Sequence, residues 1–136
     1  MQENKVRHYI KKVLENMPNN WLGLTTHRLD IYEEKLAKTQ FINQLETLYQ
    51  KGNSDAAALE ILPTAYDYIR LGHPLCCVLE WGISKLQDLQ PENVISFSSK
   101  TVPVLAVLRK NLLDNKNTQI AYRGELPDRF DAEVLK

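Results

Sequence analysis

The sequence predicts a mainly α-helical protein with a small C-terminal βαβ-like element, an α+β fold built as a single compact domain around a central buried helix. Apolar residues recur at helical spacing through much of residues 1–89. Residues 74–83 (PLCCVLEWGI) carry apolar side chains on nearly every side, so this helix needs cover all round. Beyond residue 90, two runs rich in β-branched and aromatic residues flank a further helical pattern.

The length fits one domain over residues 1–136, because a chain of 136 residues can bury a sizeable core without a disulfide or a metal. Within it we expect a helical part at 1–89, a strand–helix–strand element at 94–124 and a polar tail at 125–136. The apolar and charged fractions, 43% and 25%, are those of an ordinary globular protein.

The first helix is predicted from an apolar stripe that ends at Pro18. Residues 21–26 are ambiguous, because they alternate as a short strand would but also fit an ordered loop that places Trp21 in the core. The stripe consists of Val6, Tyr9, Ile10, Val13, Leu14 and Met17.

Three more helical regions are expected before residue 90. A long helix spans about 30–50, and a third region begins at the candidate caps Ser54 and Asp55 and is kinked or divided by Pro63. The central helix spans about 74–89, with His73 as its cap and Leu79 in the core. Its predicted inner stripe is Leu75, Val78, Leu79, Gly82, Ile83 and Leu86.

The C-terminal part reads as two strands, 94–98 and 118–123, on either side of a helix at 103–114. Their spacing is that of a right-handed crossover unit. Two parallel strands do not form a stable sheet alone. Either residues 21–26 add a strand, or a second copy of the chain pairs with the strand edge, or one of the strands is wrongly assigned.

The strongest candidate binding site is the turn formed by Ser98, Ser99, Lys100 and Thr101. Free amides at a helix start favour anions, and this turn adds hydroxyl groups and one lysine. It lacks the glycines of the phosphate-binding P-loop, so nucleotide hydrolysis is not expected there. The alternative is that Thr101 caps the helix and Ser98 and Ser99 form a solvated turn.

A second candidate is the face shared by His73, Cys76, Cys77 and Glu80. Adjacent cysteines diverge by about 100° around a helix, so we expect no metal and no cofactor there, and the thiols serve as small buried hydrophobes. No motif around either cysteine indicates a nucleophile. Glu80 lies among apolar neighbours. It is either a buried acid with a raised pKa, or a structural residue that finds a partner such as Arg70 or Arg109 or points through a gap to solvent.

Charge and composition limit the classes of partner and the cellular location that we expect. Lysine plus arginine and aspartate plus glutamate number 17 each, so the net charge of zero argues against nucleic acid and permits self-association. No apolar run reaches the ~20 residues of a membrane span. The two adjacent cysteines have no third to pair with, which favours a reducing, cytoplasmic location.

These observations favour a non-enzymatic cytoplasmic interaction or assembly protein that forms a homodimer, another homo-oligomer or a complex with a protein partner. The alternative is an enzyme or ligand-binding subunit that recognises a small phosphate- or carboxylate-bearing anion at residues 98–101. The sequence leaves open whether the protein is an enzyme.

Overall fold

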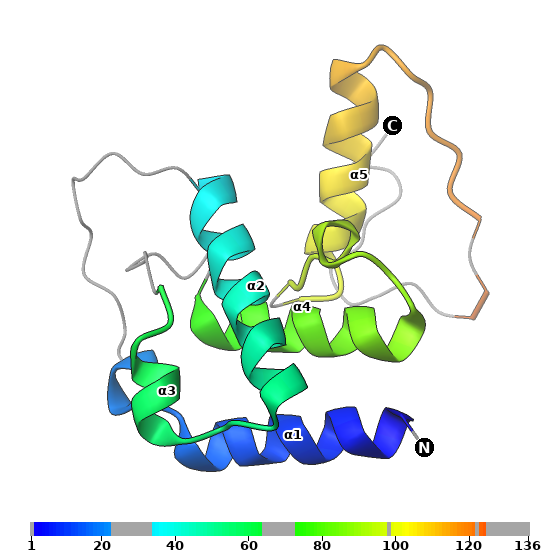
Figure 1. The fold of residues 1–136 in the computed structure, drawn as a ribbon. Coiled ribbons are helices and arrows are strands. Elements are labelled where there is room, and N and C mark those ends of the chain that lie inside the picture. Colours follow the sequence, from blue (N-terminus) through cyan, green and yellow to red (C-terminus); the bar gives the residue numbers. More distant parts are fainter. Residues whose placement is uncertain (1, 23–33, 64–72, 98, 122, 125–136) are drawn as a thin grey trace. The chain divides into compact units, whose positions relative to one another are not determined.

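The computed structural model describes residues 2–22, 34–63, 73–97, 99–121 and 123–124 (Figure 1). The chain divides into two compact units, Met1–Ser96 and Phe97–Lys136. The expectation of one domain over residues 1–136 stays a prediction, and each unit is described by itself.

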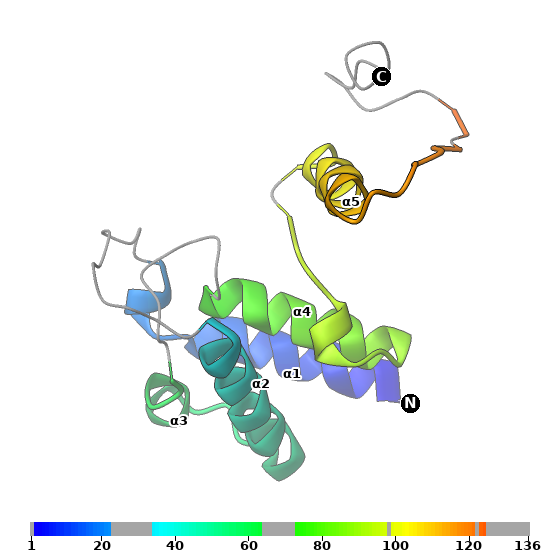
Figure 2. The same cartoon turned by 90° about the horizontal axis from the view of Figure 1, so that it is seen from above.

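The first unit is built around three helices, α1 (Gln2–Asn16), α2 (Glu34–Lys51) and α4 (Pro74–Gln87). In Figures 1 and 2, α1 and α4 lie side by side and run in opposite directions, and α2 crosses them. The short helix α3 (Ala56–Glu60) packs on α1, and two 3-10 turns, η1 (Asn19–Leu22) and η2 (Pro91–Asn93), complete the described part of the unit.

An aromatic cluster joins the three long helices. Trp81 of α4 is fully buried, and its ring lies 5.7 Å from that of Tyr9 on α1 and 5.1 Å from that of Tyr49 on α2, all in edge-on geometry. The two tyrosine rings are 5.1 Å apart. Such edge-on pairs add to the stabilisation from burial alone, so this cluster fixes how α1, α2 and α4 meet.

The predicted stripe of the first helix is confirmed except at one position. Val6, Tyr9 and Val13 are buried, and Ile10 and Met17 pack against the core. Leu14 is 45% exposed. Trp21 lies in η1, is buried, and packs against Phe41 with ring centres 5.5 Å apart. The strand proposed for 21–26 is therefore absent at residues 21 and 22, and 23–26 lie outside the described residues.

The central helix forms where the sequence predicts it, and its predicted inner stripe is confirmed at four of six positions. Val78 and Gly82 are buried, and Leu75 and Leu86 pack against the core. Cys77, Val78 and Trp81 are in the core, whereas Leu79 is 52% and Ile83 is 36% exposed. The expectation of cover all round, and of Leu79 in the core, was wrong. The reason is that the large indole of Trp81 occupies the space between α1 and α2, which turns Leu79 outward.

The first part of the third helical region forms a short helix before Pro63, as one of the two predicted alternatives has it. α3 ends at Glu60, and Leu59 and Leu62 are buried as expected. Asp55 occupies the cap position but makes no side-chain cap hydrogen bond. The predicted continuation past Pro63 lies outside the described residues.

The α+β assignment was wrong, because no strand occurs in the described part of the chain. Residues 94–97 are irregular, and their polar groups bond to side chains instead of to a neighbouring strand. The Val94 carbonyl accepts a hydrogen bond from Lys38 Nζ at 3.1 Å, and the Ser96 amide donates to Glu80 Oε1 at 2.7 Å. The described residues of 118–123 are exposed and irregular, so the βαβ-like element does not form.

The second unit contains α5 (Val102–Leu113), which confirms the helix predicted at 103–114. No residue of α5 is buried. Its end is marked by Asn115, in the left-handed conformation with φ 53°. The side chain of Asn111 donates to the Thr118 hydroxyl at 3.0 Å, which holds the following segment to the helix.

The burial pattern predicts a contrast between two leucines in the first unit. Leu45 on α2 is fully buried, so Leu45→Ala should lower the free energy of unfolding by about 2–5 kcal/mol, because a cavity remains. Leu79→Ala should cost less than about 1 kcal/mol, because half of that side chain is already in water. Urea denaturation of both variants measures the difference, and equal losses would contradict the face assigned to α4.

Candidate functional site

The predicted anion-binding turn is a conventional helix start in the part that the structure describes. The Ser99 hydroxyl accepts a hydrogen bond from the Val102 amide at 3.2 Å, whereas Thr101 makes no side-chain cap bond. Ser99 and Lys100 are exposed, and Ser98 lies outside the described residues. No strand precedes the turn in the described residues, so the topological argument for a ligand pocket is lost. Anion binding at 98–101 stays a prediction.

Glu80 is buried and forms a clamp on the segment that leads into the second unit. Its carboxylate accepts hydrogen bonds from the amide and the hydroxyl of Ser96, at 2.7 and 2.8 Å, and forms an ion pair with Lys38. Its partner among the described residues of the first unit is Lys38 of α2. Arg70, proposed as a partner from the sequence, lies outside the described residues, and Arg109 belongs to the second unit. Because a buried charge needs a partner and hydrogen bonds to be tolerated, this arrangement supplies a structural reason for Glu80.

Within the described part of the chain, His73, at the start of α4, and Cys76 and Cys77 within it do not form a metal or catalytic site. His73 Nδ1 accepts a hydrogen bond from the Leu75 amide at 3.2 Å and caps the helix as predicted. Cys77 is buried, and burial, with the nearby charge of Glu80, raises the pKa of its thiol to about 12. A thiol with that pKa is not ionised at neutral pH and is a poor nucleophile. Among the residues described, no cluster of three or more His, Cys, Asp or Glu could hold a metal ion.

The structure contains a polar hollow that sequence reasoning missed. It lies within the first unit, between the start of α1, the middle of α2, the last turns of α4 and η2, and its volume is about 310 Å³. Three separate stretches of the chain contribute to it, at residue 2, at 42–46 and at 81–91, which explains why no local motif indicates it. Its lining residues are Gln2, Ile42, Asn43, Glu46, Trp81, Ser84, Lys85, Asp88, Leu89, Gln90 and Pro91.

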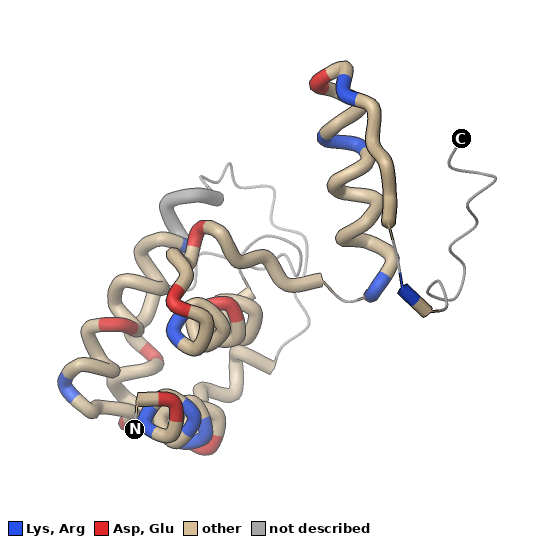
Figure 3. The backbone as a smooth tube through the Cα atoms, turned by 90° about the vertical axis from the view of Figure 1, so that its right-hand side faces the viewer, with Lys and Arg blue, Asp and Glu red and all other residues tan. Residues whose placement is uncertain are grey.

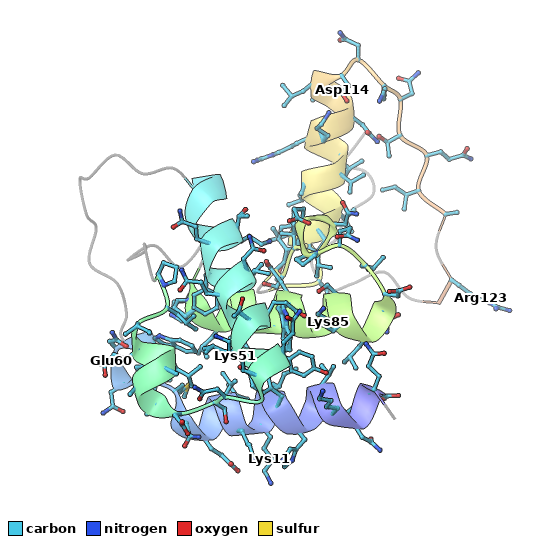
Figure 4. All side chains as sticks on the ribbon, in the orientation of Figure 1. Lys11, Lys51, Glu60, Lys85, Asp114 and Arg123 are labelled. Carbon is cyan, nitrogen blue, oxygen red and sulfur yellow. The ribbon has the colours of Figure 1, made fainter. Side chains whose placement is uncertain are left out.

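Glu46 is the organising group of this polar hollow. Its carboxylate accepts hydrogen bonds from Trp81 Nε1 at 2.8 Å and Gln50 Nε2 at 3.1 Å, and pairs with Lys85 Nζ at 2.8 Å. Figure 4 labels Lys85 where it projects from α4 beside α2. Burial alone would raise the pKa of Glu46, but the bonds from Lys85, Trp81 and Gln50 outweigh it and hold that pKa below its usual value. Glu46 is therefore a fixed negative charge at neutral pH.

A second candidate surface is α5 itself. Figure 3 shows that most of this helix carries neither acidic nor basic residues. Leu105, Leu108 and Leu112 follow one another at spacings of three and four residues, the spacing of a helix–helix seam. Leu112 is 74% exposed, and Leu105 and Leu108 are half-buried. We call these three residues the leucine seam.

Comparison of the chain with known proteins gives no family. No family model, no curated protein and no solved structure matches it. In the described ranges no helix has the length and apolarity needed to cross a bilayer.

The cap of α4 predicts a pH dependence of stability. Burial lowers the pKa of His73 from its usual value of 6.5, and a hydrogen bond to the backbone of Trp21 opposes this shift only in part. Only a neutral imidazole can accept the Leu75 amide at Nδ1. Since the folded pKa lies below the unfolded one, the contribution of His73 to stability is complete above pH 6.5 and is lost as the pH falls through the folded pKa.

We therefore expect the free energy of unfolding, measured with urea between about pH 8 and about pH 5, to fall over the acidic half of that range. His73→Asn should remove the part of this fall that His73 causes, because asparagine caps a helix without titrating. His8→Asn, at an exposed position of α1, is the matched control and should leave the fall unchanged. A fall of the same size in the His73 variant would contradict the assignment.

Proposed function

We propose that this protein is a non-enzymatic interaction protein that self-associates through the leucine seam of α5. The observation that carries the proposal is that α5 has 12 residues, of which none is buried. A helix of this length is marginal in water by itself, and most helical stability in proteins comes from packing of an apolar face. A surface that covers the seam would supply that packing.

The described remainder of the second unit offers little cover. Residues 112–121, 123 and 124 are exposed, and two side-chain hydrogen bonds, from Asn111 to Thr118 and from Lys110 to Asp114, link α5 to the described residues that follow it. A short ion pair from Lys110 to Asp114 adds little, because exposed pairs on one helix contribute about 0.3–0.5 kcal/mol. Polar contacts within the unit therefore do not replace an apolar partner.

A second copy of the chain fits the seam for two reasons. An identical helix presents the same leucines at the same spacing, so a two-fold axis pairs them reciprocally. The net charge of zero removes the self-repulsion that keeps many proteins apart. Residues elsewhere in the same chain, or a different protein, would be alternative occupants of the seam.

The dimer should be weak. A 12-residue helix is about 18 Å long, so its seam buries less than the roughly 800 Å² per partner of a stable complex. We therefore expect a dissociation constant above about 1 μM and a mass that rises with protein concentration.

Sedimentation velocity from about 1 μM to about 500 μM tests the proposal over the range in which a weak interface should saturate. The unmodified chain should shift from monomer to dimer, and Leu112→Glu should abolish the shift because it places a charge in the seam. Leu113→Glu is the matched control, since Leu113 is 81% exposed but lies about 100° away around the helix.

The two variants separate the alternatives. A monomer at every concentration, or a dimer that survives Leu112→Glu, would contradict association through the seam. If Leu112→Glu and Leu113→Glu reduce dimer formation equally, the association is nonspecific and hydrophobic, which would also overturn the proposal. Circular dichroism on each variant establishes that the helices are retained.

A further inference from the structure

The polar hollow carries an imbalance of charge. Glu46 and Lys85 neutralise each other as an ion pair at 2.8 Å. The third charged lining residue, Asp88, forms no ion pair with any described residue, so the formal charge of the lining is negative. The negative end of α4 adds to this charge, and the positive end of α1 at Gln2 offsets part of it.

Asp88 carries a negative charge at a position that does not need one. Its backbone is left-handed, with φ 53° and ψ 44°, a conformation that glycine, asparagine and aspartate all adopt, so the turn itself does not require a charge. It also places a carboxylate at the C-terminal end of α4, where the helix dipole favours cations. Two residues after α5, Asn115 has the same φ of 53°, so an uncharged residue adopts this conformation elsewhere in the chain. The fold therefore gives no reason for the negative charge of Asp88.

The remaining lining groups accept hydrogen bonds as well as donate them. The side chains of Gln2, Asn43 and Gln90 each offer an amide oxygen. Ca²⁺ and Mg²⁺ take six or more oxygen ligands, whereas the Glu46 oxygens already accept bonds from Trp81, Lys85 and Gln50. An organic cation with several N–H donors is better suited to a lining that holds the Asp88 carboxylate and several amide oxygens.

We propose that the polar hollow binds a guanidinium group, with Asp88 as its charge partner and the lining amides as further acceptors. The planar guanidinium has five N–H donors and pairs with a carboxylate through two parallel hydrogen bonds. The volume of 310 Å³ is that of about ten water molecules, enough for a guanidinium on a short alkyl chain. The group could come from a small molecule or from an arginine side chain of a peptide, and both present the same chemistry.

The test uses the full chain labelled with ¹⁵N and an NMR titration with n-butylguanidinium. The side-chain amide signals of Gln2, Asn43 and Gln90 and the indole N–H signal of Trp81 should shift together as n-butylguanidinium is added, and the shifts should saturate. The matched control ligand is n-butylurea, which has nearly the same shape and no charge, and it should cause no saturable shift at the same concentrations. A tripeptide, acetyl-Gly-Arg-Gly-amide, is titrated in parallel to compare the two sources.

Asp88→Asn is the deciding variant, because asparagine keeps the left-handed turn and removes only the charge. It should weaken n-butylguanidinium binding at least fivefold. Its melting temperature should be unchanged or higher, which separates lost binding from lost folding. Asp114→Asn, which removes an exposed charge near the end of α5, is the control and should leave the affinity unchanged.

Tighter binding of the tripeptide would identify a peptide side chain as the source, and equal or tighter binding of n-butylguanidinium would identify a small molecule; both outcomes support the site. The absence of saturable shifts, equal shifts with n-butylurea, or unchanged affinity in Asp88→Asn would overturn it. The NMR titration does not depend on self-association, so a negative result would leave the proposed dimer, which sedimentation tests, unaffected.

Discussion

The first unit depends on the burial of Trp81. An indole side chain removes about 150–250 Å² of surface from water, worth roughly 4–6 kcal/mol at about 25 cal/mol per Å². That gain requires a partner for the indole N–H, because an unsatisfied buried donor costs about 1–3 kcal/mol. Glu46 of α2 supplies the partner at 2.8 Å, and Tyr9 and Tyr49 close around the ring. Three helices are thus held by one side chain and its acceptor.

The same interaction gives rise to the polar hollow. Glu46 must lie beside the buried indole, and its charge in turn holds Lys85 and Gln50. Carboxylate, ammonium and amide groups therefore gather at the edge of an aromatic core, where α4 ends and the chain turns at Asp88. The chemistry of the hollow is in this sense a consequence of the core. The Glu80 clamp acts separately, and fixes residues 94–96 to α4 and α2 through Ser96 and Lys38.

The elements with strong periodicity could be predicted from the sequence. The stripe of α1, the cap of α4 by His73 and the position of α5 each follow from residues close together in the chain. The inner face of α4 could not, because Leu79 and Trp81 are equally apolar and only the shape of the space between α1 and α2 selects the indole. The strand at 94–98 was wrong because a β-branched run indicates an extended backbone but does not provide a strand to pair with.

In the candidate sites, too, features set by neighbouring residues could be predicted, whereas contacts between distant residues could not. The burial of Glu80 was foreseen as one of two alternatives from its apolar neighbours, but its partner Lys38 lies 42 residues away in the chain and no local pattern indicates it. The polar hollow was missed because its charged groups come from α2, α4 and the turn after α4. The one local signal was Asp88, an acidic residue near the end of a predicted helix, where a basic or neutral residue is expected.

The most direct test of this account is hydrogen exchange at the indole N–H of Trp81, one of the two tryptophans of the chain. If Trp81 is sealed among α1, α2 and α4 with its N–H bound to Glu46, its indole proton should exchange only through global unfolding. Its exchange free energy, measured by NMR in D₂O, should then equal the free energy of unfolding from urea denaturation. Exchange of the Trp81 indole within the dead time of the experiment would contradict the account.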